Sequence, residues 1–165
     1  MKPADLVFNR RVRQNHALEH ATVTLLTRDD RRLSVSARSN ARGFTIFADL
    51  DPLAVRAAGE EALRRLQCGE AELAIHPNCG TNLAVGASFM MVGSLLGLTA
   101  LRARTRVATA LASTCAGVAV ARPLGQLLQR HVTTSPEVRE LRIAEVVRRR
   151  FLGRPVVEVL TVGVR

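Results

Sequence analysis

The sequence has 165 residues, which is enough for one compact domain or for a small domain with a membrane segment. Its 24 Lys and Arg against 14 Asp and Glu give a net charge of +10, typical of proteins that meet nucleic acid or an anionic membrane surface, although an arginine- and alanine-rich genome gives the same balance. Trp and Tyr are absent, and no nucleic-acid-binding motif occurs, so we expect no nucleic acid partner. Three cysteines, an odd number in dissimilar surroundings, argue against a disulfide framework.

The first predicted helix covers residues 9–27 and carries the pattern H-x-x-E-H. Residues three and four apart share one helix face, so His16, Glu19 and His20 point the same way. Two imidazoles one turn apart can bind one Zn²⁺, and a carboxylate beside them can take a proton from the water that the metal activates. This is the order of residues in the inverzincin motif. The spacing therefore predicts His16 and His20 as metal ligands and Glu19 as catalytic base.

The next stretch alternates strand and helix signals. Asp51 and Pro52 begin a predicted helix that runs to residue 67, and Gly69 ends it. The remaining elements of this part are two strands at 33–37 and 44–48, a turn at 39–43 that joins them into a hairpin, and a short strand at 72–75.

A second unusual stretch, H-P-N-C-G-T-N, occupies residues 76–82. Its proline, asparagine and glycine predict a turn, which can aim His76 and Cys79 at one point. Both are candidate ligands that would complete the site begun by His16 and His20. The alternative is structural, with His76 capping the turn and Cys79 a small buried residue.

Two apolar runs follow, at 83–101 and 107–121, and they predict a transmembrane helical hairpin. The first run has no charged residue and is long enough to cross a bilayer, whereas Arg122 and Pro123 interrupt the second. The small residues at four-residue spacing, which would let the two helices approach closely, are Gly93, Gly97, Ser113 and Gly117. The alternative is a pair of buried helices in a soluble core.

The C-terminal part predicts a basic helix and a last strand. Ser135 and Pro136 are typical of a helix start, and the helix is expected to run through three consecutive arginines to Gly153 and to lie against anionic lipid. A strand at 156–162 would return to the earlier strands, because a lone terminal strand needs a partner.

The predicted fold is α+β: a small mixed or antiparallel sheet with packing helices, interrupted by the transmembrane hairpin. The expected divisions are residues 1–82, the hairpin at 83–128, and residues 129–165. Both flanks of the hairpin then lie on one side of the inner membrane of a bacterium. Arginines on the flanks favour the cytoplasmic side, while arginines in the connecting loop favour the opposite orientation.

The residues carry two resemblances. The segment His16 to His20, followed by a hairpin and a helix after Asp51, resembles the opening of the pitrilysin and insulysin metallopeptidases. That resemblance implies zinc on the two histidines, Glu19 as general base and a distant glutamate as third ligand. No glutamate stands at the family's usual spacing, so Glu60 or Glu61 would have to substitute, or else His76 or Cys79.

Over its whole length the chain resembles an uncharacterised family of small bacterial membrane proteins. That family similarly pairs N-H-x-x-E-H-A, here residues 15–21, with H-P-N-C-G-T-N before an apolar hairpin. The resemblance implies the layout of the chain and the pairing of its two motifs, and it brings no known activity.

The leading functional hypothesis is a membrane-anchored zinc protein, with metal-assisted hydrolysis of a peptide or other amide as its reaction. If His76 and Cys79 both bind, the site is closed and therefore structural or regulatory; a reactive Cys79 thiolate would make it a sensor. The competing hypothesis is a non-enzymatic membrane scaffold or assembly protein whose histidines pack in a core. Two imidazoles on one helix face suit a small ion better than the two axial positions of a haem. The expected partners are a lipid bilayer, a protein or peptide, and a second copy of the chain.

Overall fold

The computed structural model describes residues 9–29, 33, 35–77, 79–99 and 103–163. Four residues of the predicted elements lie outside these described ranges: Ser34, Asn78, Ala100 and Leu101. The chain divides into two compact units. One consists of residues 1–76 and 130–165, and the other of residues 77–129.

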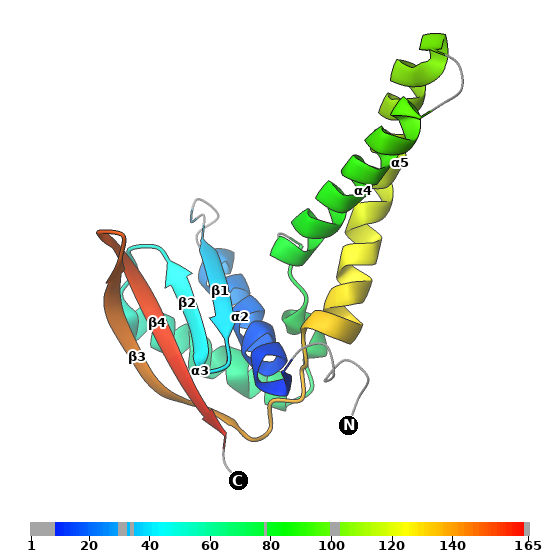
Figure 1. Ribbon diagram of the computed structural model, residues 1–165. Coiled ribbons are helices and arrows are strands. Elements are labelled where there is room, and N and C mark those ends of the chain that lie inside the picture. The colour runs from blue at the N-terminus through cyan, green and yellow to red at the C-terminus, as the bar shows by residue number, and fades with distance from the viewer. Residues whose placement is uncertain (1–8, 30–32, 34, 78, 100–102, 164–165) are drawn as a thin grey trace. The chain divides into compact units, whose positions relative to one another are not determined.

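The first unit is built on a four-stranded antiparallel sheet in the order β1-β2-β4-β3. The last strand therefore lies between strands from both halves of the chain, which confirms that it returns to the sheet and that the fold is α+β. Two helices, α2 (Arg10–Asp29) and α3 (Pro52–Gln67), pack against the sheet, α2 on β1 and β2 and α3 on β3 and β4 (Figure 1). The strands are β1 (Ser36–Asn40), β2 (Gly43–Phe47), β3 (Leu141–Phe151) and β4 (Arg154–Gly163).

Alternate residues of the central strands supply the core between the sheet and its helices. Phe44 pairs with Val159 and Ile46 with Val157, so all four side chains lie on one face, and all four are buried. Leu18 of α2 is buried in the same cluster. This packing fixes α2, the helix that carries the two predicted histidine ligands, against the sheet.

The hairpin predicted in the first half is present, but its first strand is displaced. Strand β1 begins at Ser36, and only Ala41 and Arg42 form the turn. Gly43 follows with a φ of 153°, and a side chain there would collide with the backbone carbonyl of Val159 on β4. The tight turn and this close approach set the register of the hairpin. The strand signals at 33–37 are local and carry no information about that register.

Local signals placed α3 correctly. It begins at Pro52, and the Asp51 carboxylate accepts from the backbone N–H of Leu53 at 3.2 Å. It ends before Gly69, whose φ of 97° is left-handed, as expected for a glycine that stops a helix.

The strand predicted at 72–75 is wrong. The chain there forms a short 3₁₀ helix, η1 (Ala71–Ala74), that packs against α2. The four strands of the sheet leave this segment without a strand neighbour, so its carbonyls bond elsewhere, the Ala74 carbonyl to His20.

The basic helix predicted from Ser135 to Gly153 is also wrong. Residues 134–140 form an irregular connection, and strand β3 follows it. Leu152 and Gly153 both have positive φ, 49° and 79°, and form the two-residue turn into β4. Ten registered pairs with β4 outweigh the helix-start signal, and β-branched residues such as Ile143 and Val147 suit the strand.

The second unit is an antiparallel helical pair, α4 (Gly80–Leu98) and α5 (Ala103–Leu128), as predicted. Pro123 lies inside α5 and does not end it. The predicted small-residue contacts are present: a side chain at Gly93 would lie 2.9 Å from the carbonyl oxygen of Ser113, and one at Gly97 would overlap the backbone of Ala110.

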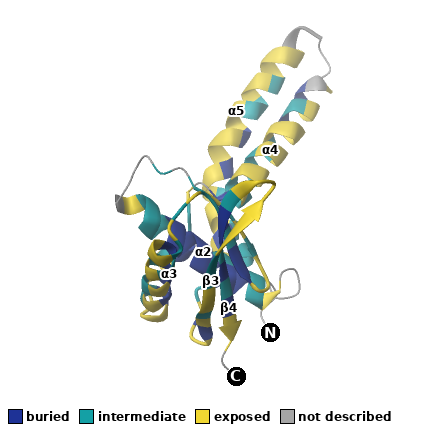
Figure 2. Cartoon of the chain, turned by 90° about the vertical axis from the view of Figure 1, so that its left-hand side faces the viewer, coloured by how far each residue is buried: buried dark blue, intermediate teal, exposed yellow. Residues whose placement is uncertain are grey.

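Two helical stretches are long and apolar enough to cross a membrane: Gly80–Gly97 in α4, and Arg106–Thr133, which runs past the end of α5. Most side chains of both helices are exposed (Figure 2). Large apolar residues such as Leu83, Met91 and Val107 are among them. The α5 helix continues into a short π-helix, η2 (Gln129–Thr133), where the chain re-enters the first unit.

Candidate metal centre

The α2 helix turns polar side chains into the interior of the first unit. Arg13, Gln14, Asn15, Glu19 and His20 are all buried. Buried polar groups are costly unless they are hydrogen-bonded, so these side chains need partners inside the first unit.

His16 and His20 lie together on one face of α2, as predicted. Their ring centroids are 4.3 Å apart. His16 Nδ1 lies 3.0 Å from the backbone carbonyl oxygen of Thr133, and His20 Nδ1 lies 2.7 Å from that of Ala74. A carbonyl only accepts, so each Nδ1 carries the hydrogen and donates it.

These two hydrogen bonds fix the chemistry of the rings. In a neutral imidazole whose Nδ1 is protonated, Nε2 carries the lone pair that binds a metal. Metal-binding histidines are commonly oriented by a backbone carbonyl at the other ring nitrogen. His16 and His20 both have this arrangement.

Glu19 lies beside the histidines and is buried. Among the described residues, its Oε2 is buried without a hydrogen-bond partner. Burial raises the pKa of the carboxyl, while the charge of His16 and a hydrogen bond with Ser39 act in the opposite direction. A buried carboxylate oxygen that has no hydrogen-bond partner in the protein is available to a ligand or a water.

His76 joins this cluster from the end of the first unit's N-terminal part. Its ring centroid is 5.8 Å from that of His20. Burial, and then the charge of His20, lowers the pKa of His76, so the neutral ring is favoured. The structure thus brings three of the four histidines together.

Cys79 belongs to the second unit, at the start of α4. It is the residue before the helix, and its Sγ accepts from the backbone N–H of Thr81 at 3.4 Å. Asn82 of the same motif fixes this turn, because its side-chain amide donates to the Pro77 carbonyl at 2.7 Å and accepts from Gln129 at 2.7 Å.

Sequence reasoning missed the residue that anchors the site helix. Asn15 is fully buried, donates to the Asn40 carbonyl at 2.8 Å and accepts from the Thr161 hydroxyl at 2.7 Å. It therefore ties α2 to β1 and β4 next to His16. Its place directly before the H-x-x-E-H pattern was the available signal.

Glu60 and Glu61, the glutamates considered as third ligands, have other partners. Glu60 pairs with Arg56 at 2.9 Å, and Glu61 pairs with Arg64 at 2.8 Å and with Arg65 at 2.6 Å, all on α3. Their carboxylates are thus committed to arginines of their own helix.

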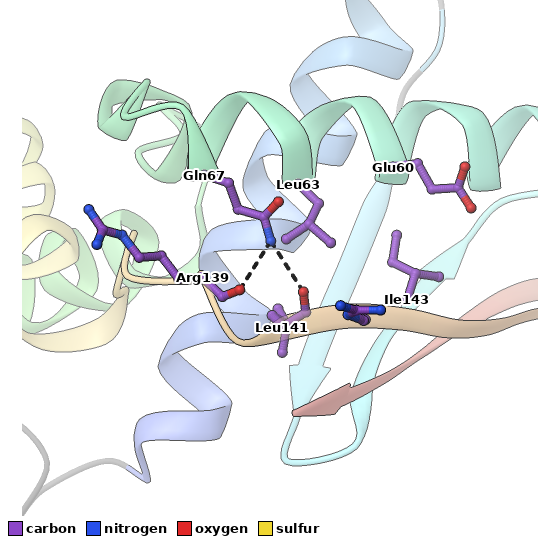
Figure 3. Close-up of a pocket in the computed structure, with 7 residues that line it drawn as sticks. Glu60, Leu63, Gln67, Arg139, Leu141 and Ile143 are labelled. Carbon is purple, nitrogen blue, oxygen red and sulfur yellow. Dashed lines mark hydrogen bonds between the residues drawn. The ribbon is translucent and has the colours of Figure 1, made fainter. Parts of the chain in front are cut away.

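A groove of about 490 Å³ separates α3 from the start of β3 (Figure 3). At its base the Gln67 amide donates to the carbonyls of Arg139 and Leu141. The groove shares no residue with the histidine cluster, so the candidate metal centre remains on α2. Its lining comprises Glu60, Leu63, Gln67, Arg139, Leu141, Arg142 and Ile143.

The fold and the site define the class: an α+β protein with a long helical hairpin and a buried helix that presents two oriented histidines. The chain belongs to the family described as domain of unknown function DUF6391, whose model matches residues 11–146. This agrees with the predicted kinship to a family without an assigned function, and both sequence motifs fall within the match. The resemblance to pitrilysins stays a prediction.

A relative from Picosynechococcus sp., described as an uncharacterized protein, is 34% identical over 137 residues. The match covers 75% of this chain and 66% of the relative, so the chain spans about two thirds of the relative's length. No solved structure matches the chain.

Proposed function

We propose that the protein binds a transition-metal ion, with zinc the best match, through His16 and His20 of the first unit, with Cys79, three residues after His76, as the third ligand. The observation that carries the proposal is the pair of rings one helical turn apart, each with its Nδ1 bonded to a backbone carbonyl. Two imidazole nitrogens and a thiolate are a donor set that zinc prefers.

The covalent chain supports Cys79 as the third ligand. Only two residues separate it from His76, so their Cα atoms are at most about 11 Å apart. The His76 ring lies 5.8 Å from that of His20. Cys79 is therefore tethered near the histidines whatever the placement of the helical hairpin.

A three-ligand site would leave a position for water and thus support hydrolysis. The bound ion would act as a Lewis acid that polarises a substrate carbonyl and makes water more acidic. Glu19 would accept the proton of the attacking water through the oxygen that is buried without a partner, and would pass it to the leaving group. The substrate class would be a peptide or another amide.

We further propose that α4 and α5 anchor this site in a bilayer. Their exposed apolar side chains suit contact with lipid, and the close contacts at their glycines suit packing of the two helices against each other within a bilayer. Both ends of this hairpin join the first unit, so that unit lies wholly on one side of the membrane, which we assign to the cytoplasm.

Metal content of the full chain, purified in detergent, tests the site. We expect about one zinc per chain in the wild type, and its loss in His16→Ala, His20→Ala and Cys79→Ala. His131→Ala is the matched control, because the His131 side chain is exposed and the substitution keeps the backbone carbonyl to which Arg13 donates. Glu19→Gln should keep the metal. Well-folded wild type that takes up no metal from a zinc buffer would refute the proposal.

Cobalt substitution separates the open site from a closed one. Thiolate-to-cobalt charge transfer that disappears in Cys79→Ala would identify the thiol ligand. His76 beside His20 favours a second candidate function, a closed structural site with four protein ligands. In that case His76→Ala would also lose the ion, and the protein would be a membrane scaffold or sensor instead of a hydrolase.

Chemical labelling of Cys68 tests on which side of the membrane the first unit lies. It is exposed in the first unit, whereas Cys79 and Cys115 belong to the helical pair. A membrane-impermeant maleimide should label Cys68 in inverted vesicles and not in intact spheroplasts, with Cys68→Ser as the blank. Labelling in spheroplasts would place the first unit on the outer side.

A further inference from the structure

The turn between β3 and β4 exposes two apolar side chains, with arginines before and after them in the chain. Leu152 is 88% exposed and Phe151 is 55% exposed. Arg148, Arg149 and Arg150 precede them and Arg154 follows. Monomeric surfaces do carry scattered apolar side chains, but two adjacent ones at the tip of a hairpin among four arginines form a defined surface.

This tip extends beyond the rest of the sheet. The β2–β4 pairing reaches only as far as Ile46 with Val157. The last three pairs of the β3–β4 hairpin, from Arg149 with Val156 to Phe151 with Arg154, have no β2 partner (Figure 1). The Phe151 ring packs edge-on against Phe47 at the end of β2, with ring centroids 5.6 Å apart, and leaves part of its own surface exposed, whereas Leu152 is almost fully presented to the surroundings.

The turn itself is not optimised for stability. Leu152 has a φ of 49°, a left-handed conformation that suits asparagine or glycine and disfavours a large side chain. A leucine that is both strained and almost fully exposed gains nothing from the fold. Such a position is better explained by contact with something outside the chain.

The charges around the tip are available for an anionic partner. Arg148 pairs with Asp49 at 3.0 Å, and Arg149 lies 3.6 Å from Glu158. Within the described part of the chain, neither Arg150 nor Arg154 has an acidic partner. Guanidinium groups that flank exposed apolar side chains match the interface of a bilayer, where phosphates lie above acyl chains.

We propose that the β3–β4 hairpin tip docks on the surface of an anionic lipid bilayer, with Leu152 and Phe151 in the interface and Arg150 and Arg154 on the headgroup phosphates. The proposal extends the membrane placement suggested above and does not involve the metal. Nucleic acid would meet the arginines but would leave the leucine without a role.

The chain has no tryptophan, so Leu152→Trp gives it one fluorophore at the tip. The matched control is Val162→Trp, at the opposite end of the same strand β4, where Val162 is 48% exposed. Both full-length variants are reconstituted in vesicles of phosphatidylcholine, with or without an equal amount of phosphatidylglycerol. Quenching by brominated lipids then reports contact with the bilayer.

We expect Leu152→Trp to be quenched in the anionic vesicles and Val162→Trp to be quenched in neither. Adding Arg150→Gln and Arg154→Gln should lower the ratio of docked to undocked hairpin about 30-fold, since each arginine at an anionic surface contributes about 1 kcal/mol. Equal quenching in neutral and anionic vesicles, or none in either, would overturn the proposal. A concentration-dependent emission shift in detergent without lipid would also overturn it, because the tip would then bind a second copy.

Flotation of the wild type with neutral vesicles separates this inference from the anchor. If the chain floats and Leu152→Trp is not quenched, only the docking proposal fails. If the chain does not float with neutral vesicles, the anchor formed by α4 and α5 fails. In that case flotation with vesicles that contain phosphatidylglycerol still tests docking, because docking predicts that this flotation is lost when Arg150 and Arg154 are replaced.

Discussion

The α2 helix and the α4–α5 pair distribute polarity in opposite ways. In α2, polar and ionisable side chains such as Asn15, Glu19 and His20 are buried. In α4 and α5, large apolar side chains such as Leu95 and Leu111, each 62% exposed, lie on the outside (Figure 2). One helix places polar groups where water is excluded, and the other two expose apolar groups where water would be expected.

The difference teaches what stabilises each unit. A buried polar helix depends on the hydrogen bonds that its buried side chains make, so its stability is concentrated in a few polar contacts. A helical pair with an apolar exterior gains little from burial of that exterior, and depends on close backbone approach at small residues. The two units should therefore respond to different substitutions.

The largest effect is expected from Asn15→Ala in the first unit. The substitution removes the fully buried Asn15 amide and its two hydrogen bonds, to the Asn40 carbonyl and from the Thr161 hydroxyl, which should lower the free energy of unfolding by about 3 kcal/mol. Urea denaturation of the detergent-solubilised chain, in EDTA to remove the effect of bound metal, measures it.

Thr27→Ala is the control for this comparison. The Thr27 hydroxyl bonds within its own helix, to the carbonyls of Val23 at 2.8 Å and Thr24 at 3.4 Å, so we expect a change within about 0.5 kcal/mol. If the two variants lose the same stability, polar contacts between α2 and the sheet are not what holds the first unit together.

An intermediate effect is expected from Gly97→Ala in the helical pair. The added methyl group would overlap the Ala110 backbone and force α4 and α5 apart, at a cost of about 2 kcal/mol. Gly86→Ala is the matched control, because its methyl group would make an ordinary contact, 3.6 Å from the Ala121 side chain. Scanning calorimetry in detergent should show a lower unfolding temperature for Gly97→Ala alone. Equal temperatures would mean that close packing does not stabilise this pair.

Local chemistry determined what the sequence could predict. Asp51 and Gly69 mark the ends of α3 by themselves, and the long uncharged run marks α4. His16 and His20 could be placed together because helix periodicity alone fixes their spacing.

Contacts between residues far apart in the chain determined the features that the sequence could not predict. The carbonyl that orients His16 lies 117 residues away and the one that orients His20 lies 54 away, so no sequence pattern contains them. Strand β3 exists because β4 pairs with it, and the local signals around Ser135 favoured a helix. The hydrogen bonds of Asn15 likewise became visible only once β1 and β4 were in place.

The smallest effect concerns the surface of the first unit, where neither buried polar groups nor close packing is involved. Hydrogen bonds from Arg64 and Arg65 lower the pKa of Glu61 from 4.5 to about 2. A carboxyl whose pKa is lower in the folded state adds stability above pH 4.5, and this contribution is lost as the pH falls toward 2. The wild type should thus unfold at a slightly higher temperature than Glu61→Gln at pH 6, with the difference shrinking across that window. Because the group is exposed, salt should weaken the effect.

Circular dichroism melts of the wild type and Glu61→Gln in EDTA test this pH dependence, and the double variant Arg64→Gln/Arg65→Gln should lose it as well. A difference that persists at pH 2 would show that Glu61 acts through packing instead of charge.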